Sequence, residues 1–575
     1  MKDRVQQDIG AKELLTDWNA IDWKLVRKRV KNLRQRIYRA TQNGQWNKVR
    51  SLMKLMLRSY SNLLLSVRRV TQENQGRKTA GIDGRRALTP DERVALVHEM
   101  QEYTPWKVKP AKRIYIPKSN GKQRPLGIPC IADRVSQTIV KNALEPSWEA
   151  RFEANSYGFR PGRSCHDAIS QCYKRLKKGG DTWILDADLR GAFDNVSHQF
   201  IVSTIGDIPG KELIKQWLKA GYVEAGMFHE TSKGTPQGNC LSPLLLNIAI
   251  NGLEELLATH HKVREYTYTQ RDGRQRVSRK KLKRYGFIRY ADDIQVTAET
   301  KEDIEAIVPT IEKWLQQRGL ELNKEKTSIV HVKDGVNFLG FHIRQFKGSC
   351  YTLPQKEKVL SFLAKIRDWL DANVSAKPEA VIYTLNPLLR GWGNYYRHGV
   401  SKKMFHYVDH HVFLALWKWA RKRHPSKGKR WIAAKYFMPA HGRRWTFNTT
   451  VEDRHGQKKT ITLMWLADIP IERHIKVKGT ASPDDPHLHT YWADRQTRYG
   501  RTHWYSRKLR YVAESQNWRC PVCSAHLFNG EELQIHHKLA VRDGGTNRAE
   551  NLIHLHKDCH QHLHQMSQFY QLQEA

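Results

Sequence analysis

Acidic residues are missing from a long stretch near the start of the chain. Between Trp23 and Gln72 there is no Asp or Glu, whereas 14 residues are Lys or Arg. Apolar residues recur there at helical spacing, which predicts helices with one apolar face and a strongly basic outer face. A charge run is usually a solvated surface, but the complete absence of acids favours contact with phosphate groups.

Acids are also scarce overall, because 57 Asp and Glu stand against 98 Lys and Arg in 575 residues, a formal net charge of +41. A protein this basic most often binds a polyanion, and nucleic acid is the first candidate. A basic surface that serves only solubility is the alternative, and the size of the excess argues against it. A hydrophobic content of 39% with 18 Trp indicates globular folding. The length predicts roughly three to five domains.

Long hydrophobic runs are absent too, so we expect no membrane span. The start, MKDRVQQDIGAKELLTDW, contains acids and no apolar core, and we expect neither a signal peptide nor a transit sequence. Cysteine is scarce: eight residues in a chain this long do not make a disulfide framework. Five are scattered and three cluster near the C-terminus with the spacing of metal ligands. A reducing cytoplasm fits this usage.

Two adjacent carboxylates interrupt an otherwise apolar strand in YGFIRYADDIQVTA, residues 285–298. Burying Asp292 and Asp293 costs free energy unless a partner compensates their charges. A second apolar strand, in TWILDADLRGAFDN, leads to Asp188. If Asp188 lies beside the pair, the three carboxylates make a Mg²⁺ site, and two such ions about 4 Å apart support in-line nucleotidyl transfer. Taken alone, a pair of aspartates fits a turn with solvated acids equally well.

With these residues the chain resembles the reverse transcriptases encoded by group II introns. RYADD resembles the metal-binding hairpin of the palm, and DADLRGAFDN resembles its partner strand. Further blocks follow in the family's order: RIYIPKSNGKQRPLGIPCIADRVSQ, SYGFRPGRSCHDA, GTPQGNCLSPLLLN, RGLELNKEKT and NFLGFHI. Because Tyr-Ala-Asp-Asp is intact, the resemblance implies an active RNA-directed DNA polymerase.

The resemblance also implies roles for single residues of the polymerase site. Asp188 and Asp292 would bridge two Mg²⁺ ions, and Asp293 would be a weaker ligand or a support. Lys118 and Arg124 would clamp the triphosphate of a dNTP, since fixed cations neutralise developing charge. The alternative for these two cations is that they are solvated loop residues.

Three more residues belong to the same implied site. Gln237 would line the nucleotide pocket. Phe193 would place a ring against the sugar and exclude a ribose 2′-hydroxyl, so deoxynucleotides would be preferred. Lys326 would either assist the pyrophosphate leaving group or be a surface lysine.

The stretch from Leu385 to Pro425 interleaves aromatic rings with Arg, Lys and His. An aromatic stripe at helical spacing is usually core, yet GWGNYYRHG resembles the thumb, or maturase domain X, of the same family. That resemblance implies binding of intron RNA, which relies on cations and stacking rings. The rings concerned are Trp392, Tyr395, Tyr396, Phe405, Tyr407, Trp417 and Trp419.

The last 60 or so residues contain two ligand pairs with the spacing of a closed tetrahedral zinc site, Cys520-x-x-Cys523 and His556-x-x-Cys559. The family's usual fourth cysteine is replaced by His556, which also suits zinc. A zinc finger that only binds DNA is the simple interpretation of these four residues.

The sequence between and after these pairs resembles an HNH nuclease, in the segments IHHK, GG, NL and CHQHLH. His537 would be the general base that activates water, and Asn551 would orient it. His536 and His560, with His564 as a candidate third ligand, would bind one divalent ion, Mg²⁺ by expectation. A DNA-binding zinc finger does not account for this His-His pair with its downstream Asn.

These observations predict a multidomain α+β protein with right-hand polymerase fingers and palm, an α-helical thumb and a C-terminal ββα-metal HNH module. The predicted domains are a basic helical RNA-binding extension (1–80), fingers and palm (81–345), thumb or maturase domain X (346–440), a DNA-binding region and linker (441–510) and the HNH endonuclease with its structural zinc (511–575).

The expected partners are group II intron RNA, held as a ribonucleoprotein with the lariat, double-stranded target DNA and dNTPs. The RNA would insert into one DNA strand, the HNH module would cut the other, and the cut 3′ end would prime reverse transcription. The expected location is the cytoplasm of a bacterium, in association with nucleoid DNA. The alternatives are a splicing factor with vestigial polymerase blocks, a retron-type reverse transcriptase, and a nuclease alone. Retron-type reverse transcriptases lack the C-terminal modules, and a nuclease alone leaves the first 500 or so residues unexplained.

Overall fold

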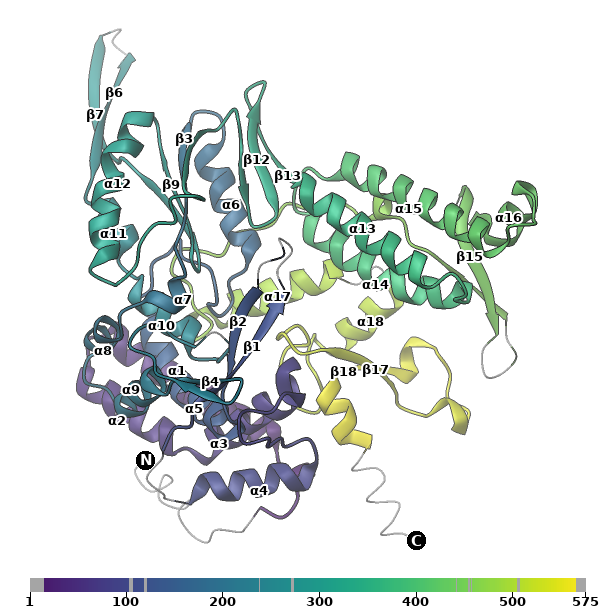
Figure 1. The fold of residues 1–575 in the computed structure, drawn as a ribbon, viewed down its shortest axis with the longest axis horizontal. Helices are drawn as coiled ribbons and strands as arrows, with labels where there is room; N and C mark the ends of the chain where they lie inside the picture. Colours follow the sequence, from purple (N-terminus) through teal and green to yellow (C-terminus); the bar gives the residue numbers. More distant parts are fainter. Residues whose placement is uncertain are drawn as a thin grey trace.

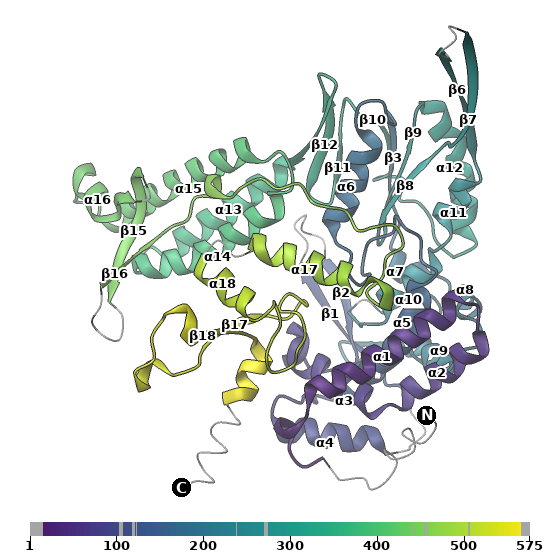
Figure 2. The same cartoon turned by 180° about the vertical axis from the view of Figure 1, so that it is seen from behind.

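The computed structural model describes residues 15–102, 107–117, 121, 123–236, 238–269, 274–440, 442–452, 456, 458–503 and 507–564. Figure 1 shows the N-terminal helices in purple below a teal body of strands and helices, with a green helical body to one side. The yellow C-terminal module lies beside the purple helices in both views (Figures 1 and 2). No helix in the described part of the chain is both long and apolar enough to span a bilayer.

The predicted N-terminal helices are confirmed. Asp22 begins the first of them, because its carboxylate accepts hydrogen bonds from the backbone N–H groups of Lys24 and Leu25. The apolar face, including Val30 and Ile37, is buried in a core shared with the palm. The helices are α1 (Trp23–Gln42), α2 (Trp46–Arg58), α3 (Tyr60–Arg68), α4 (Pro90–Gln101) and, packed between them and the palm, α5 (Ile131–Glu149).

Two four-stranded sheets follow. The first has the order β2-β1-β4-β5 and the second, which carries the paired aspartates, has the order β10-β3-β9-β8. Their strands are β1 (Ala111–Pro117), β2 (Gln123–Ile128), β4 (Tyr222–Glu224) and β5 (Met227–His229), and β3 (Trp183–Asp188), β8 (Gly286–Tyr290), β9 (Asp293–Ala298) and β10 (Ser328–His331). Helices α6 (Cys165–Leu176), α7 (Ala192–Asn195), α8 (His198–Ile205), α9 (Lys211–Lys219), α10 (Ser242–Ala249), α11 (Leu253–Ala258) and α12 (Lys301–Gln316) surround them.

Three apolar segments are broken by turns. The stretch 288–298 is a hairpin, with Ala291 and Asp292 between β8 and β9. The stretch 338–343 also turns, between β11 (Val336–Phe338) and β12 (Phe341–Phe346), which pairs with β13 (Ser349–Pro354). The apolar stretch 241–257 divides into α10 and α11 at Gly252, whose φ of +103° a helix interior does not allow.

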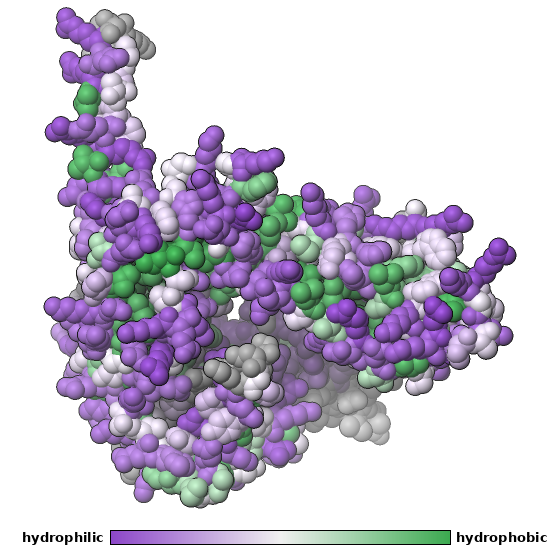
Figure 3. Space-filling view, turned by 45° about the horizontal axis from the view of Figure 1, so that its top comes forward, coloured by the Kyte–Doolittle hydropathy of each residue, from purple (hydrophilic) through white to green (hydrophobic). Residues whose placement is uncertain are grey.

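An antiparallel ribbon, β6 (His261–Thr269) and β7 (Gln275–Lys283), projects from the palm side of the molecule. Nearly every residue of both strands is exposed. Figure 3 shows the ribbon as a mostly hydrophilic projection with a few apolar side chains near its base.

The green body contains α13 (Lys356–Ala372), α14 (Pro378–Tyr396), α15 (Lys402–Arg423) and α16 (Lys429–Tyr436), followed by the sheet β14 (Phe437–Ala440), β15 (Arg443–Glu452) and β16 (Lys458–Thr462). Its aromatic stripe is mainly core. Phe405 and Trp419 are fully buried, Tyr396 is 5% exposed, and only Tyr407 of the seven rings is strongly exposed, at 43%. The rings therefore contribute mainly to the core of this body and little to its surface.

The Pro/Asp-rich stretch TASPDDPHLH is not the exposed linker that its composition predicts. Ser482 is fully buried, and Asp484 forms a two-pronged ion pair with Arg34 of α1, at 2.8 and 2.7 Å. Arg34 also contacts Glu145 of α5 at 2.9 Å. This segment continues into α17 (His489–His503) and α18 (Arg507–Ser515).

The segment just before it is held by Asp167, a fully buried residue of α6. Asp167 accepts hydrogen bonds from His474 (2.9 Å), Arg495 (2.8 Å) and the backbone N–H of Val477 (2.7 Å). We call residues 474–495 the strap, because they join the palm and the N-terminal helices to the C-terminal module. Burial alone opposes ionisation of Asp167, but these donors outweigh it and hold its pKa well below the usual range.

Replacing Asp167 with Ala is expected to lower the free energy of unfolding by about 3 kcal/mol at neutral pH, because Arg495 loses its buried partner. A depressed pKa stabilises the fold above the carboxyl's unfolded pKa of about 3.9 and loses that effect as the pH falls through the folded value. The difference in the free energy of unfolding between wild type and variant, measured in urea, should therefore decrease below about pH 4. Asp207→Ala, at an exposed position, is the control and should change stability by less than about 0.5 kcal/mol.

Candidate active sites and metal centres

Three carboxylates meet at one end of the palm sheet. In the β3–β9 register Asp188 lies directly opposite Asp293, the first residue of β9. Directly opposed residues in an antiparallel pair have Cβ atoms roughly 5 Å apart. Asp292 is the neighbouring turn residue, and Ala291 before it has a φ of +56°, which makes the tight reversal. Residues more than a hundred positions apart in the chain thus form one acidic cluster.

Burial and mutual repulsion disfavour ionisation in this cluster. Burial, followed by the charges of Asp292 and Asp188, raises the pKa of Asp293 to about 7. Burial also raises the pKa of Asp292, Asp188 adds to this effect, and the positive charges of Arg124 and Lys326 oppose it. Lys326 donates a hydrogen bond to Asp188 Oδ2 at 2.6 Å, which raises the pKa of the lysine.

This cluster fits a divalent cation. A buried carboxylate such as Asp293 can keep its proton near neutral pH when no cation neutralises its charge. It ionises when a metal ion binds. Hard oxygen ligands with open positions for water and phosphate oxygens are the set that Mg²⁺ prefers. Asp188, Asp292 and Asp293 are the residues that would hold it.

Buried hydrogen bonds and close backbone packing support the hairpin that carries the aspartates. Arg289 of β8 is fully buried and donates a hydrogen bond to Asn247 Oδ1 at 2.9 Å, while Asn247 Nδ2 donates to the carbonyl of Gly158 at 2.9 Å. The backbone N–H of Tyr157 donates to the carbonyl of Arg289. A Cβ on Gly158 would press into the backbone nitrogen of Ala291. The SYGFRPG motif therefore supports the turn that aims the carboxylates.

The implied nucleotide-binding residues are only partly described. Phe193 of α7 is buried and lines a cavity of about 250 Å³ together with Thr235 and Pro236. The backbone N–H of Thr235 donates to the carbonyl of Phe193 at 2.5 Å, so the GTPQG loop packs on α7. Arg124 lies in β2 and acts electrostatically on Asp292. Lys118 and Gln237 lie outside the described residues.

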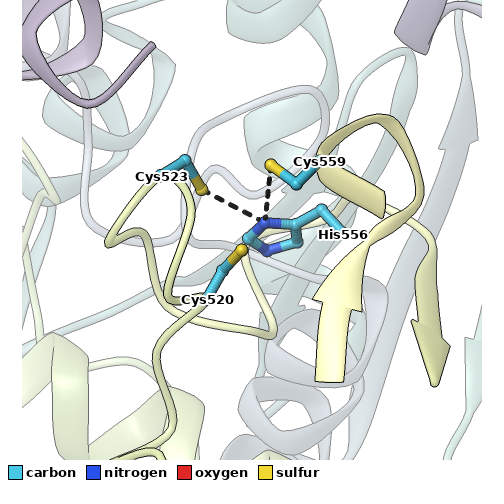
Figure 4. Close-up of side chains that lie close together, drawn as sticks. All are labelled: Cys520, Cys523, His556 and Cys559. Atoms are coloured by element: carbon cyan, nitrogen blue, oxygen red, sulfur yellow. Dashed lines mark hydrogen bonds between the residues drawn. The ribbon is translucent and has the colours of Figure 1, made fainter. Parts of the chain in front are cut away.

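The four predicted zinc ligands come together in the C-terminal module (Figure 4). Cys520, Cys523, His556 and Cys559 are all buried, and their ligand atoms lie within 4.8 Å of one another. His556 Nδ1 faces the sulfurs, 3.3 Å from Cys523 Sγ, while Nε2 lies 3.2 Å from the carbonyl of His526. A proton on Nε2, donated to that carbonyl, leaves Nδ1 as the ligand nitrogen. The donor set fits a closed tetrahedral zinc site.

Beside this centre, His536, His560 and His564 form a second cluster with ligand atoms within 4.8 Å of one another. His536 lies in β17 (Leu533–His537), which pairs antiparallel with β18 (Leu552–His556), and the other two lie in the helical segment 557–564. Burial, and then the proximity of His560 and His564, lowers the pKa of His536 to about 4. The neutral imidazole that results is the form that binds a metal ion.

The predicted role of Asn551 is corrected. His537 Nε2 contacts Asn547 Oδ1 at 2.8 Å, whereas Asn551 forms no hydrogen bond with His537 among the described residues. The Asn551 side chain instead bonds to both backbone groups of Leu539 and to the carbonyl of Thr546. These bonds close the loop that carries Asn547, so Asn551 affects His537 indirectly, through Asn547.

Two features escaped the sequence analysis. The β6–β7 ribbon carries a dense run of cations, QRVSRKKLKR, whose charge alone could have indicated nucleic-acid contact. Second, Glu531 of the C-terminal module contacts Arg27 (2.6 Å) and Arg68 (3.4 Å) of the N-terminal helices. No local signal predicts a contact between residues some 500 positions apart.

Four family models match the chain. They are the reverse transcriptase (RNA-dependent DNA polymerase) at residues 116–343, the N-terminal domain of reverse transcriptase at 18–100, the group II intron maturase-specific domain at 359–437 and the HNH endonuclease at 520–566.

Several relatives are similar over part of the chain. Protein YkfC of Escherichia coli is 36% identical over 338 residues, which cover 53% of this chain and 87% of that protein. The group II intron-encoded protein LtrA of Lactococcus lactis is 31% identical over 320 residues, 47% of this chain and 53% of LtrA. A solved structure of apo telomerase from Candida tropicalis aligns with a TM-score of 0.30 and 15% identity over 44% of this chain and 56% of that one, a likeness too weak to support an argument.

Fold, sites and matches define an RNA-directed DNA polymerase joined to an HNH endonuclease. With its maturase-specific domain, the chain belongs to the group II intron-encoded proteins, which combine reverse transcriptase, splicing and endonuclease roles.

Replacing Gly158 with Ala is expected to lower primer extension by about 100-fold, because a displacement of about 1 Å at a catalytic group has that effect. Zinc content should be unchanged, since the module that binds it lies elsewhere. Gly428→Ala is the control, at an exposed glycine with a φ of −71° where a Cβ meets no atom within 4 Å. Normal extension by the Gly158 variant would show that the turn does not depend on this packing.

Replacing His556 with Cys should keep one zinc ion per protein, whereas His556→Ala should lose it, because only the first change preserves four ligands. Metal analysis after dialysis measures the difference. Loss of zinc is expected to expose the small apolar core around Cys520 and Leu555, which limited proteolysis would detect as cleavage within residues 511–564. Retention of zinc by the Ala variant would remove His556 from the ligand set.

Proposed function

We propose that the chain mobilises a group II intron by copying its RNA into DNA at a site that its own nuclease cuts. The observation that carries the polymerase part is the register of Asp188 opposite Asp293, with Asp292 at the adjoining turn. Asp188 and Asp292, with Asp293 as a weaker ligand or a support, would hold two Mg²⁺ ions. When bound, these ions activate the primer 3′-hydroxyl and neutralise the departing pyrophosphate.

The chain's own residues orient the incoming dNTP. Arg124 and Lys118 hold the triphosphate, Gln237 lines the pocket, and the ring of Phe193 occupies the space that a 2′-hydroxyl would need. The buried position of Phe193 beneath the GTPQG loop supports this role. The 3′-hydroxyl loses its proton to water, and its oxygen bonds to the α-phosphorus as the bond from that phosphorus to the oxygen bridging the β-phosphate breaks. Lys326, protonated beside Asp188, donates a proton to the leaving pyrophosphate.

The HNH module hydrolyses one strand of the target DNA in a ββα-metal arrangement. His537, oriented through Nε2 by Asn547, accepts a proton from water at Nδ1 as the water oxygen bonds to phosphorus. The bond to the 3′-oxygen then breaks, and this oxygen takes a proton from water to become a 3′-hydroxyl that can prime synthesis. His536, His560 and His564 hold one divalent ion, which stabilises the leaving oxygen when bound. The zinc centre is structural.

Three basic surfaces grip the intron RNA. They are the outer faces of α1 and α2, the helices α13–α16 acting as thumb or maturase domain X, and the β6–β7 ribbon. Their exposed cations, together with the net charge of +41, supply the phosphate contacts. The region 441–510 adds contacts with target DNA. The protein thus stays with the excised lariat as a ribonucleoprotein, in the cytoplasm of a bacterium and in contact with nucleoid DNA.

Two variants separate the activities. Asp292→Asn should lower primer extension on poly(rA)/oligo(dT) by about 10³-fold, because it removes a metal-binding charge. His537→Ala should lower nicking of plasmid DNA in Mg²⁺ by a factor of about 10² to 10⁴, the usual contribution of a general base. Each variant should keep the other activity. Primer extension that survives Asp292→Asn would overturn the polymerase assignment, and nicking that survives His537→Ala would overturn the nuclease assignment.

A further inference from the structure

A cavity of about 540 Å³ lies where the N-terminal helices meet the C-terminal module. One wall carries His560 and His564 of the three-histidine cluster, together with Lys557. The opposite wall belongs to the first 93 residues of the chain. Its volume falls in the range of natural ligand pockets, about 300 to 1,000 Å³.

The N-terminal wall is cationic and aromatic. Arg77, Lys78 and Arg93 line it beside the rings of Trp18 and Trp23. Arg93 is almost fully buried and is fixed by hydrogen bonds to Thr71 and to the carbonyl of Leu88. Cations on one surface hold a nucleic-acid strand through its phosphates, whereas these two rings are buried and support the wall from within.

Two of these cations have no acidic partner to neutralise them. Arg77 donates a hydrogen bond to the carbonyl of Gln72, and neither Arg77 nor Lys78 forms an ion pair with any residue that the structure describes. Lys557 pairs with Glu532, and Arg68 pairs with Glu73 and Glu531. Arg93 forms no ion pair among the described residues either, but its guanidinium is buried and held by Thr71 and Leu88. Arg77 and Lys78 are therefore the cations of this lining, which also includes Asp558, that are best placed to contact a phosphate.

The two walls are held together by specific contacts. Glu531 pairs with Arg27 and Arg68, and Arg68 also lies 3.9 Å from the sulfur of Cys559, a zinc ligand that directly precedes His560. The guanidinium of Arg68 covers the ring of Trp23 at 4.6 Å. The docking of the modules thus places the N-terminal cations across the cavity from the histidine cluster.

We infer that this cavity is the DNA-strand site of the nuclease, and that the N-terminal helices supply half of it. The strand lies between the two walls, with the phosphate to be cut at the histidine cluster and neighbouring phosphates on Arg77 and Lys78. This inference rests on the proposed nuclease function and adds that cleavage requires the polymerase end of the chain.

The test compares Arg77→Ala/Lys78→Ala with Lys177→Ala/Lys178→Ala, an adjacent pair of exposed cations on the palm. Binding of a short fluorescein-labelled DNA duplex is measured in EDTA in the His537→Ala background, so that neither metal nor cleavage contributes. Removing two phosphate contacts should lower the slope of log affinity against log salt by about 2 and weaken binding about tenfold near physiological salt. In the active protein the same pair should raise KM for plasmid nicking and leave kcat unchanged.

The palm pair should change neither quantity, and zinc content is measured for every variant to confirm that the module is folded. Unchanged DNA binding in the Arg77/Lys78 variant would overturn the inference. Faster nicking by that variant would also overturn it, because the N-terminal wall would then cover the site instead of completing it. If His537→Ala still nicked DNA while the Arg77/Lys78 pair weakened binding, the nuclease assignment would fail and the DNA site would stand.

Discussion

The polymerase site depends on three carboxylates held close together, although burial and mutual repulsion oppose the charged form of Asp292 and Asp293. Asp188, Asp292 and Asp293 are brought together by strand register and the adjoining turn, and burial, followed by the resulting repulsion, raises the pKa of Asp293 to about 7. Packing around the turn keeps the three carboxylates together despite this repulsion. The turn can neither slide nor open, because Gly158 lies against its backbone and the buried Arg289 anchors the strand behind it. A rigid support of this kind keeps a charge cluster ready for metal ions instead of letting it disperse into solvent.

Much of this arrangement follows from local patterns. Helical periodicity predicts α1 to α3, and the seven ordered motifs predict the palm and its acidic residues. The hairpin within 288–298 follows from the resemblance of RYADD and not from turn residues, because its turn contains Ala291 and Asp292, without the Gly or Asn that usually marks a positive φ. The spacing of the cysteines and histidines was sufficient for both clusters of the C-terminal module.

Long-range contacts account for what could not be predicted. Asn547, the partner of His537, belongs to a loop whose path is set by the hydrogen bonds of Asn551. The pairing of Arg27 with Glu531 joins residues at opposite ends of the chain. The Pro/Asp-rich part of the strap has the composition of a linker, yet Asp484 in it is buried because Arg34 offers its carboxylate a charge to pair with. Such partners are visible only once the chain has folded.

The strap has a consequence for how the protein is made. Residues 474–495 fill places in the palm and beside α1 that were synthesised hundreds of residues earlier. A ribosome must therefore translate most of the message before the polymerase half acquires its last stabilising pairs. A shortened polymerase engineered without the nuclease should end after the strap, because a stop codon placed at the end of the maturase-specific match would leave Arg34 and Asp167 without these partners.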